Sequence, residues 1–214
     1  MPALSTDEMR KIVRKIARTD PAFSGIIKAS PLCDIGVKRS GRGHYQTLVN
    51  SILSQQLAIK AAATISERVR ALCGGKITPE KISALDIDQL RAAGVSGAKT
   101  RAILELTDAT INKDLHFSKY PKMSNDEISA ELTALWGVGR WTVEMFLMFH
   151  LGRLDLWPVG DLGVRRGWER LHQLPEQIKP EELELLGNQF KGHQSIVAWY
   201  CWRALEAEYP TRKG

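Results

Sequence analysis

Hydrophobic residues recur along the chain every three to four positions, which is the spacing of one face of an α-helix. One such face near the N-terminus consists of Met9, Ile12, Val13 and Ile16. No segment sustains the alternation of a β-strand beyond a few residues. The pattern therefore predicts an all-α protein.

Helix starts can be placed from the residues that cap them. Ser5 with Glu8, and Ser124 with Glu127, have the spacing of a capping box, in which each residue satisfies a backbone N–H of the other. Thr78 precedes a proline, and proline suits the first position of a helix. We expect helices to begin at these three places.

Three pairs of short helices are expected in the middle of the chain. Two helices between His44 and Leu72 are joined near residues 55–58. Further on, "AAGVSGAKT" at 92–100 (the upstream turn) parallels "LWGVGRWTV" at 135–143 (the downstream turn). Each reads as a helix, a glycine turn and a second helix.

Composition changes this picture only slightly. The formal charge of +6 and the pI near 9.3 are compatible with a polyanionic partner without establishing one. The three cysteines are odd in number and widely spaced, so neither disulfides nor structural zinc are expected. The most apolar segment, "MFLMFHLG", is too short to span a bilayer. We expect an intracellular protein, in the cytoplasm or nucleoid of a bacterium or the nucleus of a eukaryote, with no membrane contact.

The downstream turn carries the first candidate chemistry. Gly137 can adopt the positive φ that ends a helix, and Gly139 leaves room for a ligand at the start of the next. Amides at a helix N-terminus attract anions such as a phosphate diester, and Arg140 adds charge beside them. A glycine turn that only packs two helices together explains the same residues.

A second segment distinguishes these explanations. In "WPVGDLGVRRG" at 157–167, Asp161 stands at an expected helix start, 22 positions after Gly139 (161 − 139). Together the two segments resemble the helix-hairpin-helix and Gly-Pro-Asp signature of a DNA glycosylase superfamily. The segments "LVNSILSQQLAIKAAATISERV" at 48–69 and "LRAAGVSGAKTRAI" at 90–103 are most similar to the 3-methyladenine DNA glycosylase II branch, which acts on alkylpurines.

The resemblance implies an all-α fold of two lobes with the active site in a cleft between them. One lobe is expected to comprise residues 1–43 and 158–214, and the other residues 44–157. The chain departs from the pattern in having Trp136 where the hairpin usually carries proline, which we expect to loosen the turn slightly. It also has Gly160 where a second acidic residue often precedes the aspartate.

Asp161 is the candidate catalytic residue. Breaking a bond between a base and deoxyribose builds positive charge at C1′, and an ionised carboxylate near that carbon would stabilise it and orient the attacking water. A plain helix cap explains the same aspartate in isolation. Bifunctional relatives carry a lysine nucleophile at the position of Trp141, and a tryptophan cannot form a Schiff base, so we expect a monofunctional enzyme.

The same tryptophan suggests how a base is held. Cationic alkylpurines are attracted to an aromatic face, and Trp141 would provide it, with Met145 one helical turn away. The resemblance implies a third pocket residue, His193. Ordinary core packing is the alternative for Trp141 and a stronger one for His193. The aromatic residues of the last helix, Trp199, Tyr200 and Trp202, are expected to lie in the core.

The remaining assignments follow from the resemblance. The residues expected to bind DNA are Gly137, Val138, Gly139, Arg140 and Thr142 of the hairpin, and Gln56 or Leu57 as the wedge that fills the gap left by an extruded nucleotide. A Na⁺ or K⁺ ion is implied on backbone carbonyls near Leu135 and Val138. An iron–sulfur cluster is not expected, because the four closely spaced cysteines of some relatives are absent.

The sequence thus predicts a monomeric glycosylase that removes alkylated purines such as 3-methyladenine and 7-methylguanine from double-stranded DNA. A uracil or mismatch glycosylase of the same superfamily is one alternative. A helix-hairpin-helix module that binds DNA without catalysis is another, although a pure binder has no need of the carboxylate at Asp161.

Overall fold

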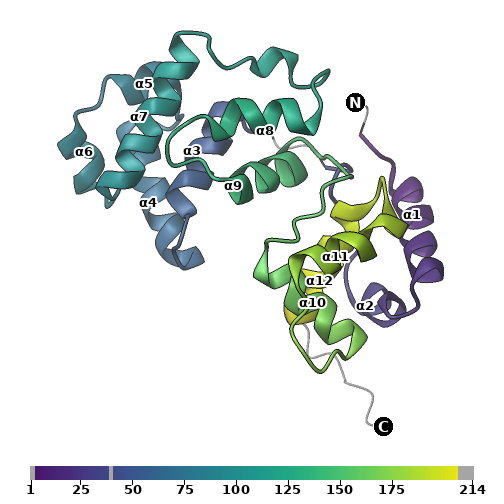
Figure 1. Ribbon diagram of the computed structural model, residues 1–214. Helices are drawn as coiled ribbons and strands as arrows, with labels where there is room; N and C mark the ends of the chain where they lie inside the picture. Colours follow the sequence, from purple (N-terminus) through teal and green to yellow (C-terminus); the bar gives the residue numbers. More distant parts are fainter. Residues whose placement is uncertain (1–2, 39–40, 207–214) are drawn as a thin grey trace. The chain divides into compact units, whose positions relative to one another are not determined.

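The computed structural model describes residues 3–38 and 41–206, and in these ranges the chain is helical and contains no strand (Figure 1). The predicted all-α class is confirmed. The chain divides into two compact units, unit 1 with Met1–Arg39 and Leu147–Gly214, and unit 2 with Ser40–Phe146. These divisions fall earlier in the chain than the expected lobe boundaries after residues 43 and 157. Within the described ranges, no helix combines the length and apolar character needed to cross a bilayer.

Unit 2 is built from short helices around α7. Its elements are α3 (His44–Ser54), α4 (Ile59–Leu72), α5 (Pro79–Ser83), α6 (Ile87–Ala92), α7 (Gly97–Ile111), η1 (Phe117–Lys119), α8 (Asn125–Thr133) and α9 (Arg140–Met145). Helices α3, α5 and α6 all pack on α7. The fully buried side chains Leu48, Ile52, Ile103 and Leu106 form the centre of this packing. Between α3 and α7, the Tyr45 hydroxyl and Thr107 Oγ1 share a buried hydrogen bond of 2.7 Å.

Unit 1 combines helices from the N-terminal and the C-terminal parts of the described chain. Its elements are α1 (Thr6–Thr19), α2 (Phe23–Ala29), the π-helical turn η2 (Phe146–His150) that begins at the unit boundary, α10 (Leu162–His172), α11 (Pro180–Gly187), η3 (Asn188–Phe190) and α12 (Gln194–Glu206). Helices α10 and α12 form its most extensive contact.

Two glycines set the close approach of α10 to α12. A Cβ atom built on Gly163 would lie 2.8 Å from Cδ1 of Trp202. One helical turn later, a Cβ atom on Gly167 would overlap the main-chain carbonyl of Cys201. Any side chain at either position would therefore push the two helices apart.

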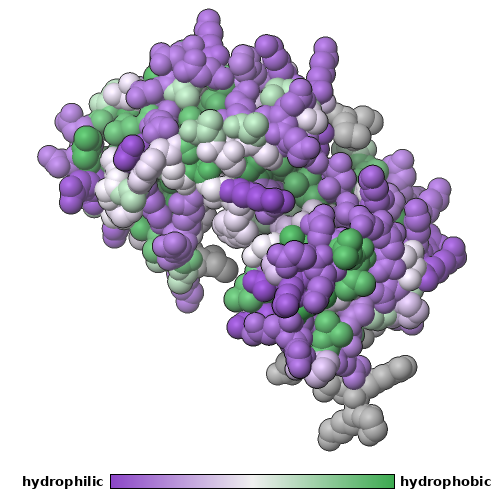
Figure 2. Space-filling model, in the orientation of Figure 1, coloured by the Kyte–Doolittle hydropathy of each residue, from purple (hydrophilic) through white to green (hydrophobic). Residues whose placement is uncertain are grey.

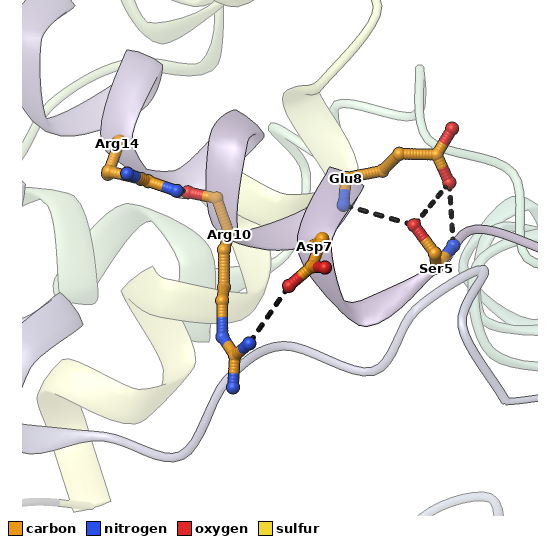
Figure 3. A network of polar contacts seen from close by, with 5 residues as sticks. All are labelled: Ser5, Asp7, Glu8, Arg10 and Arg14. Atoms are coloured by element: carbon orange, nitrogen blue, oxygen red, sulfur yellow. Dashed lines mark hydrogen bonds and ion pairs between the residues drawn. The ribbon is translucent and has the colours of Figure 1, made fainter.

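The predicted helix starts are confirmed. Figure 3 shows the capping box of α1, in which Glu8 Oε2 accepts from the Ser5 amide at 2.7 Å and Ser5 Oγ accepts from the Glu8 amide at 3.2 Å. The backbone hydrogen bond from Ser5 is the main reason that the pKa of Glu8 is lowered. Helix α8 has the same arrangement, and the Thr78 hydroxyl caps α5.

Much of the surface is charged. The face in Figure 2 is mostly hydrophilic, with smaller hydrophobic areas between the polar side chains. On α1, the exposed basic side chains are Arg10, Lys11, Arg14, Lys15 and Arg18. In Figure 3 Arg10 pairs with Asp7 at 2.9 Å on the same exposed face. Such a surface fits the basic composition and by itself identifies no partner.

Candidate functional site

The downstream turn joins α8 to α9, and its first glycine is required by geometry. Gly137 has a φ of +79°, in the left-handed region that side chains disfavour. A Cβ atom there would also lie 2.8 Å from the Cβ of Ala102. Glycine is thus needed both for the backbone conformation and for contact with α7.

The second glycine leaves the start of α9 open. Gly139 is the N-cap residue of α9, and no side chain caps the first turn. A Cβ atom on Gly139 would meet nothing within 4 Å. Since the first amides of a helix have no partner inside the helix, this end can donate hydrogen bonds to an anion.

Two of the predicted hairpin residues are buried. The side chain of Val138 packs inside unit 2, and Thr142 is only 3% exposed. Thr142 Oγ1 accepts a hydrogen bond from Gln55 Nε2 at 3.0 Å. Contact between either residue and DNA would therefore involve the main chain, whereas the side chain of Arg140 lies on the surface.

A carboxylate that the sequence analysis missed pairs with Arg140. Glu144 is 7% exposed, and its Oε1 atom lies 2.9 Å from Arg140 Nε. The spacing of four residues on one helix was the available signal. This pair holds one side of the guanidinium group, while the Arg140 side chain remains 79% exposed.

Trp136, which stands where the hairpin usually carries proline, is anchored to α7. The Trp136 amide donates to Glu105 Oε1 at 2.7 Å, and the guanidinium of Arg101 lies 4.3 Å from the centre of the indole ring. Proline would have no amide to donate. Both partners come from α7 and fix the turn to that helix, and the expected loosening relative to proline stays a prediction.

The candidate wedge lies in the loop between α3 and α4. Gln56 has a φ of +54°, which is unusual for a residue with a side chain, and its side chain is exposed. Leu57 is 39% exposed despite its apolar side chain. Both candidates are thus displayed on the surface of unit 2, as a wedge would have to be.

Trp141 does not belong to the core. It is 48% exposed, although its neighbours Thr142 and Val143 on α9 are buried. Met145, half-buried, follows it at the i+4 position. The alternative of ordinary core packing therefore does not explain Trp141, whose indole is partly exposed on the same side of α9 as Met145.

Asp161 is the N-cap of α10 and is held by two donors. Its Oδ1 atom accepts from the Val164 amide at 2.8 Å and from the Trp202 indole N–H at 2.9 Å. The side chain is half-buried. Two N–H groups directed at one oxygen fix the carboxylate's orientation.

The last helix supplies one residue to this site that was expected in the core. Tyr200 is fully buried as predicted, but Trp202 is only half-buried and bonds to Asp161. The ring of Phe149, which is 47% exposed, lies 5.7 Å from the Trp202 ring. The spacing of hydrophobic residues did not distinguish Trp202 from Tyr200, because α12, thirteen residues long and apolar on most sides, shows no clear face.

His193 lies just before α12. Its amide donates to the Phe190 carbonyl at 2.8 Å, and the side chain is half-buried. Within the described ranges its Nδ1 atom is buried and has no hydrogen-bond partner. Such an atom is uncommon at a position with a purely structural role.

The predicted site residues thus form two sets. The hairpin, the wedge loop, Trp141 and Met145 belong to unit 2, while Asp161 and His193 belong to unit 1. Each set is internally ordered by the contacts described above.

Metal-binding side chains are not gathered in the part of the chain that the structure describes. No group of three His, Cys, Asp or Glu residues there could hold an ion. The cysteines are buried, and burial raises the pKa of the Cys33 thiol to about 12. The hairpin offers carbonyl oxygens instead, and that of Leu135 accepts from the Val138 amide at 3.2 Å.

Comparison with known proteins places this geometry in a family. The model of the HhH-GPD superfamily of base excision DNA repair proteins matches residues 49–191. The chain therefore belongs to the helix-hairpin-helix and Gly-Pro-Asp superfamily.

Within that superfamily the chain is similar to enzymes named for 3-methyladenine. It is 35% identical to DNA-3-methyladenine glycosylase 1 of Schizosaccharomyces pombe over 74% of this chain and 71% of that protein. The structure of a DNA-3-methyladenine glycosidase from Bacillus halodurans matches with a TM-score of 0.81 and 33% identity, over 92% of each chain. An S. pombe 3-methyladenine DNA glycosylase in complex with abasic DNA matches with a TM-score of 0.77 and 29% identity, over 91% of this chain and all of that one.

Proposed function

We propose that this protein is a DNA glycosylase that removes alkylated purines by hydrolysis of the N-glycosidic bond, in base excision repair. The observation that carries the proposal is the carboxylate of Asp161, held on Oδ1 by the Val164 amide and the Trp202 indole. The names of the similar proteins support the same substrate class.

In the proposed reaction, Asp161 faces the sugar of the damaged nucleotide. As the bond to the base breaks, positive charge develops at C1′, and the fixed negative charge stabilises it. The second role of the carboxylate is to orient a water molecule for attack on C1′. Because an alkylated purine already carries positive charge, it leaves readily as a neutral base, and little acid catalysis is needed.

Base selection rests on Trp141 and Met145. The exposed indole offers a π-face to a cationic purine, worth roughly 1 to 2 kcal/mol for such a pair. Met145 adds an adaptable apolar surface one turn away. His193 is the proposed third contact, through the ring whose Nδ1 has no partner within the described ranges.

We further propose that the enzyme is of the type II class and has no lyase activity. Trp141 occupies the position of the lysine that forms a Schiff base in bifunctional relatives. Borohydride should therefore trap no covalent adduct with an abasic product. A trapped adduct would contradict this part of the proposal.

The proposed DNA contact is made by the downstream turn. The uncapped first turn of α9 donates to a backbone phosphate, and Arg140 adds positive charge. Carbonyl oxygens near Leu135 and Val138 are of the type that Na⁺ and K⁺ prefer, so the turn fits such an ion, which would add charge for the same phosphate. We propose that the protein acts on double-stranded DNA as a monomer.

The test is base release from methylated duplex DNA, with the freed bases identified by mass. Asp161→Asn should reduce release at least about 100-fold, as is typical when a group that stabilises a developing charge is lost. The fold should survive, because asparagine caps helices as well as aspartate does. The control Glu176→Gln changes an exposed carboxyl in the same unit and should have no effect.

Three results would contradict the proposal. Near-normal release by a folded Asp161→Asn protein would remove Asp161 from the chemistry. Release of uracil or of mismatched bases, with none from methylated DNA, would favour another glycosylase of the superfamily. Binding without release on every duplex would favour a module that only binds DNA.

A further inference from the structure

The loop that carries the wedge candidates, residues 54–58, is held in a disfavoured conformation. Gln56 adopts a φ of +54°, which costs a residue with a side chain about 1 kcal/mol or more. A backbone in such a region persists when the surrounding structure fixes it. Two side chains provide the restraint.

The first restraint links the loop to the downstream turn. Gln55 Nε2 donates to the Gly137 carbonyl at 3.1 Å and to Thr142 Oγ1 at 3.0 Å. The amide thereby uses both of its N–H groups on one turn. Because Gln55 immediately precedes Gln56, these bonds fix the loop where its backbone turns left-handed.

The second restraint links the end of α3, immediately before the loop, to the upstream turn. Lys99, on the first turn of α7, donates through Nζ to the Leu53 carbonyl at 2.8 Å. That carbonyl belongs to the last turn of α3, where no partner exists within the helix and where positive charge is favoured. Burial lowers the pKa of Lys99, as expected for an ammonium group drawn from water to serve this contact.

The downstream turn thus holds Gln55, within the loop, and the upstream turn holds Leu53, immediately before it. We call these two restraints, made by the side chains of Gln55 and Lys99, the clamp. We propose that Gln55 and Lys99 are positioning residues that hold Gln56 and Leu57 ready to enter the duplex as the damaged nucleotide leaves it. This inference rests on the proposed function and extends it to the extrusion step. A loop ordered in advance inserts without the entropic cost of ordering on binding.

The clamp has a second consequence. Gln55 bonds to the carbonyl of Gly137, within the turn whose helix offers amides to the phosphate. The phosphate-binding turn and the wedge thus belong to one rigid frame. A DNA backbone bound at the downstream turn is then held at a fixed position relative to Gln56 and Leu57.

The experiment compares two duplexes that differ only opposite the lesion. In one, the methylated purine is paired; in the other, it faces an abasic-site analogue, so no base pair must be broken. The variants are Gln55→Met and Lys99→Met, which remove the donors but keep side-chain length. The controls are Gln177→Met and Lys76→Met, which make the same changes at exposed positions.

For each clamp variant we expect single-turnover base release from the paired duplex to fall about tenfold, the factor that corresponds to one or two net hydrogen bonds. Release from the unpaired duplex should fall by less than about twofold, since no pair must be opened. Combining Gln55→Met with Leu57→Ala should be no worse than Leu57→Ala alone, because residues acting through one another are not additive. Thermal melting reports whether each variant is folded.

Equal losses on both duplexes, or full additivity with Leu57→Ala, would overturn the inference. So would unchanged release by a clamp variant on the paired duplex. These outcomes differ from failure of the proposed function, in which the unaltered protein would release no base from either duplex.

Discussion

The upstream and downstream turns have nearly the same backbone and differ at one cap. Each begins with a glycine at positive φ, +96° for Gly94 and +79° for Gly137. Each is followed by a helix, α7 and α9 respectively. In the upstream turn the N-cap is Ser96, whose hydroxyl accepts from the Lys99 amide at 3.4 Å, whereas in the downstream turn it is Gly139, which has no side chain to do so.

This difference separates a turn that is capped within the protein from the turn that we propose binds DNA. The Ser96 hydroxyl accepts a hydrogen bond from one of the amides at the start of α7 that have no partner within the helix. Gly139 has no side chain to do this at the start of α9, so an acceptor from outside the helix can bond to the amides there. The upstream turn contributes instead a side chain, Lys99, directed at α3. Two similar turns in one chain thus differ in whether a side-chain hydroxyl caps the following helix, and it is the uncapped turn that we propose binds phosphate.

The largest expected difference between the turns is at their first glycines. Gly137→Ala should lower the free energy of unfolding by about 2–4 kcal/mol, because the left-handed backbone and the contact with Ala102 both oppose a side chain. Gly94→Ala should cost less, since its nearest neighbour at 3.2 Å is the flexible side chain of Ile65. Urea denaturation of the two variants measures the difference, and equal losses would contradict it.

The next largest expected effect is on the pH dependence of stability. It concerns Glu131 on α8, the helix that leads into the downstream turn. Burial alone would raise the pKa of Glu131, but hydrogen bonds from the His116 amide and ring and from the Tyr120 hydroxyl lower it. The stability it contributes is therefore complete above the unfolded-state pKa of 4.5 and is lost as pH falls through the lower folded-state pKa.

Glu131→Gln should accordingly destabilise the protein at pH 7 by about 1–2 kcal/mol, in the range for hydrogen bonds to a charged group. The difference from the unaltered protein should shrink as pH falls below 4. Urea denaturation across this pH range tests the sign. A difference that stays constant, or grows toward acid, would show that the ionised carboxylate is not the stabilising species.

A smaller effect is expected from exchanging the caps. Gly139→Ser places a hydroxyl at the start of α9, where there is space for it, and it should accept from the Thr142 amide. Stability should rise by a few tenths of a kcal/mol. Affinity for duplex DNA should fall about fivefold, since an amide otherwise available to the phosphate is engaged. Fluorescence anisotropy with labelled duplex measures this, and tighter binding would contradict the assignment.

The smallest effect is expected from the reciprocal exchange. Ser96→Gly should cost only a few tenths of a kcal/mol, as glycine is a nearly adequate cap. DNA affinity should be unchanged, because the upstream turn is not proposed to bind phosphate. A gain in affinity would mean that both turns can bind DNA once uncapped.

Much of the local structure could be predicted because it depends on residues close in sequence. The capping boxes at Ser5 and Ser124, the helix after Thr78 and the turn at Gly137 all involve partners within three or four positions. Asp161 was recognised for a different reason, because its spacing from the hairpin matched a family pattern. Its capping of α10 was expected on local grounds and is confirmed.

What escaped prediction depends on contacts between distant segments. Trp202 reaches Asp161 across 41 positions, Gln55 reaches Thr142 across 87, and Glu105 reaches Trp136 across 31. No periodicity encodes such pairs, since they arise only when the helices pack. Trp136 shows this most clearly, because its amide and its ring contact Glu105 and Arg101, which lie on another helix.

The glycine pair on α10 has a consequence for how this enzyme could evolve. The place of the Asp161 carboxylate, the proposed catalytic group, depends on two missing methyl groups, at Gly163 beside Trp202 and at Gly167 against Cys201. A mutation to alanine at either would leave every polar group intact and still shift the Asp161 oxygen from its partners. Selection on the chemistry should therefore also act on positions that carry no functional group.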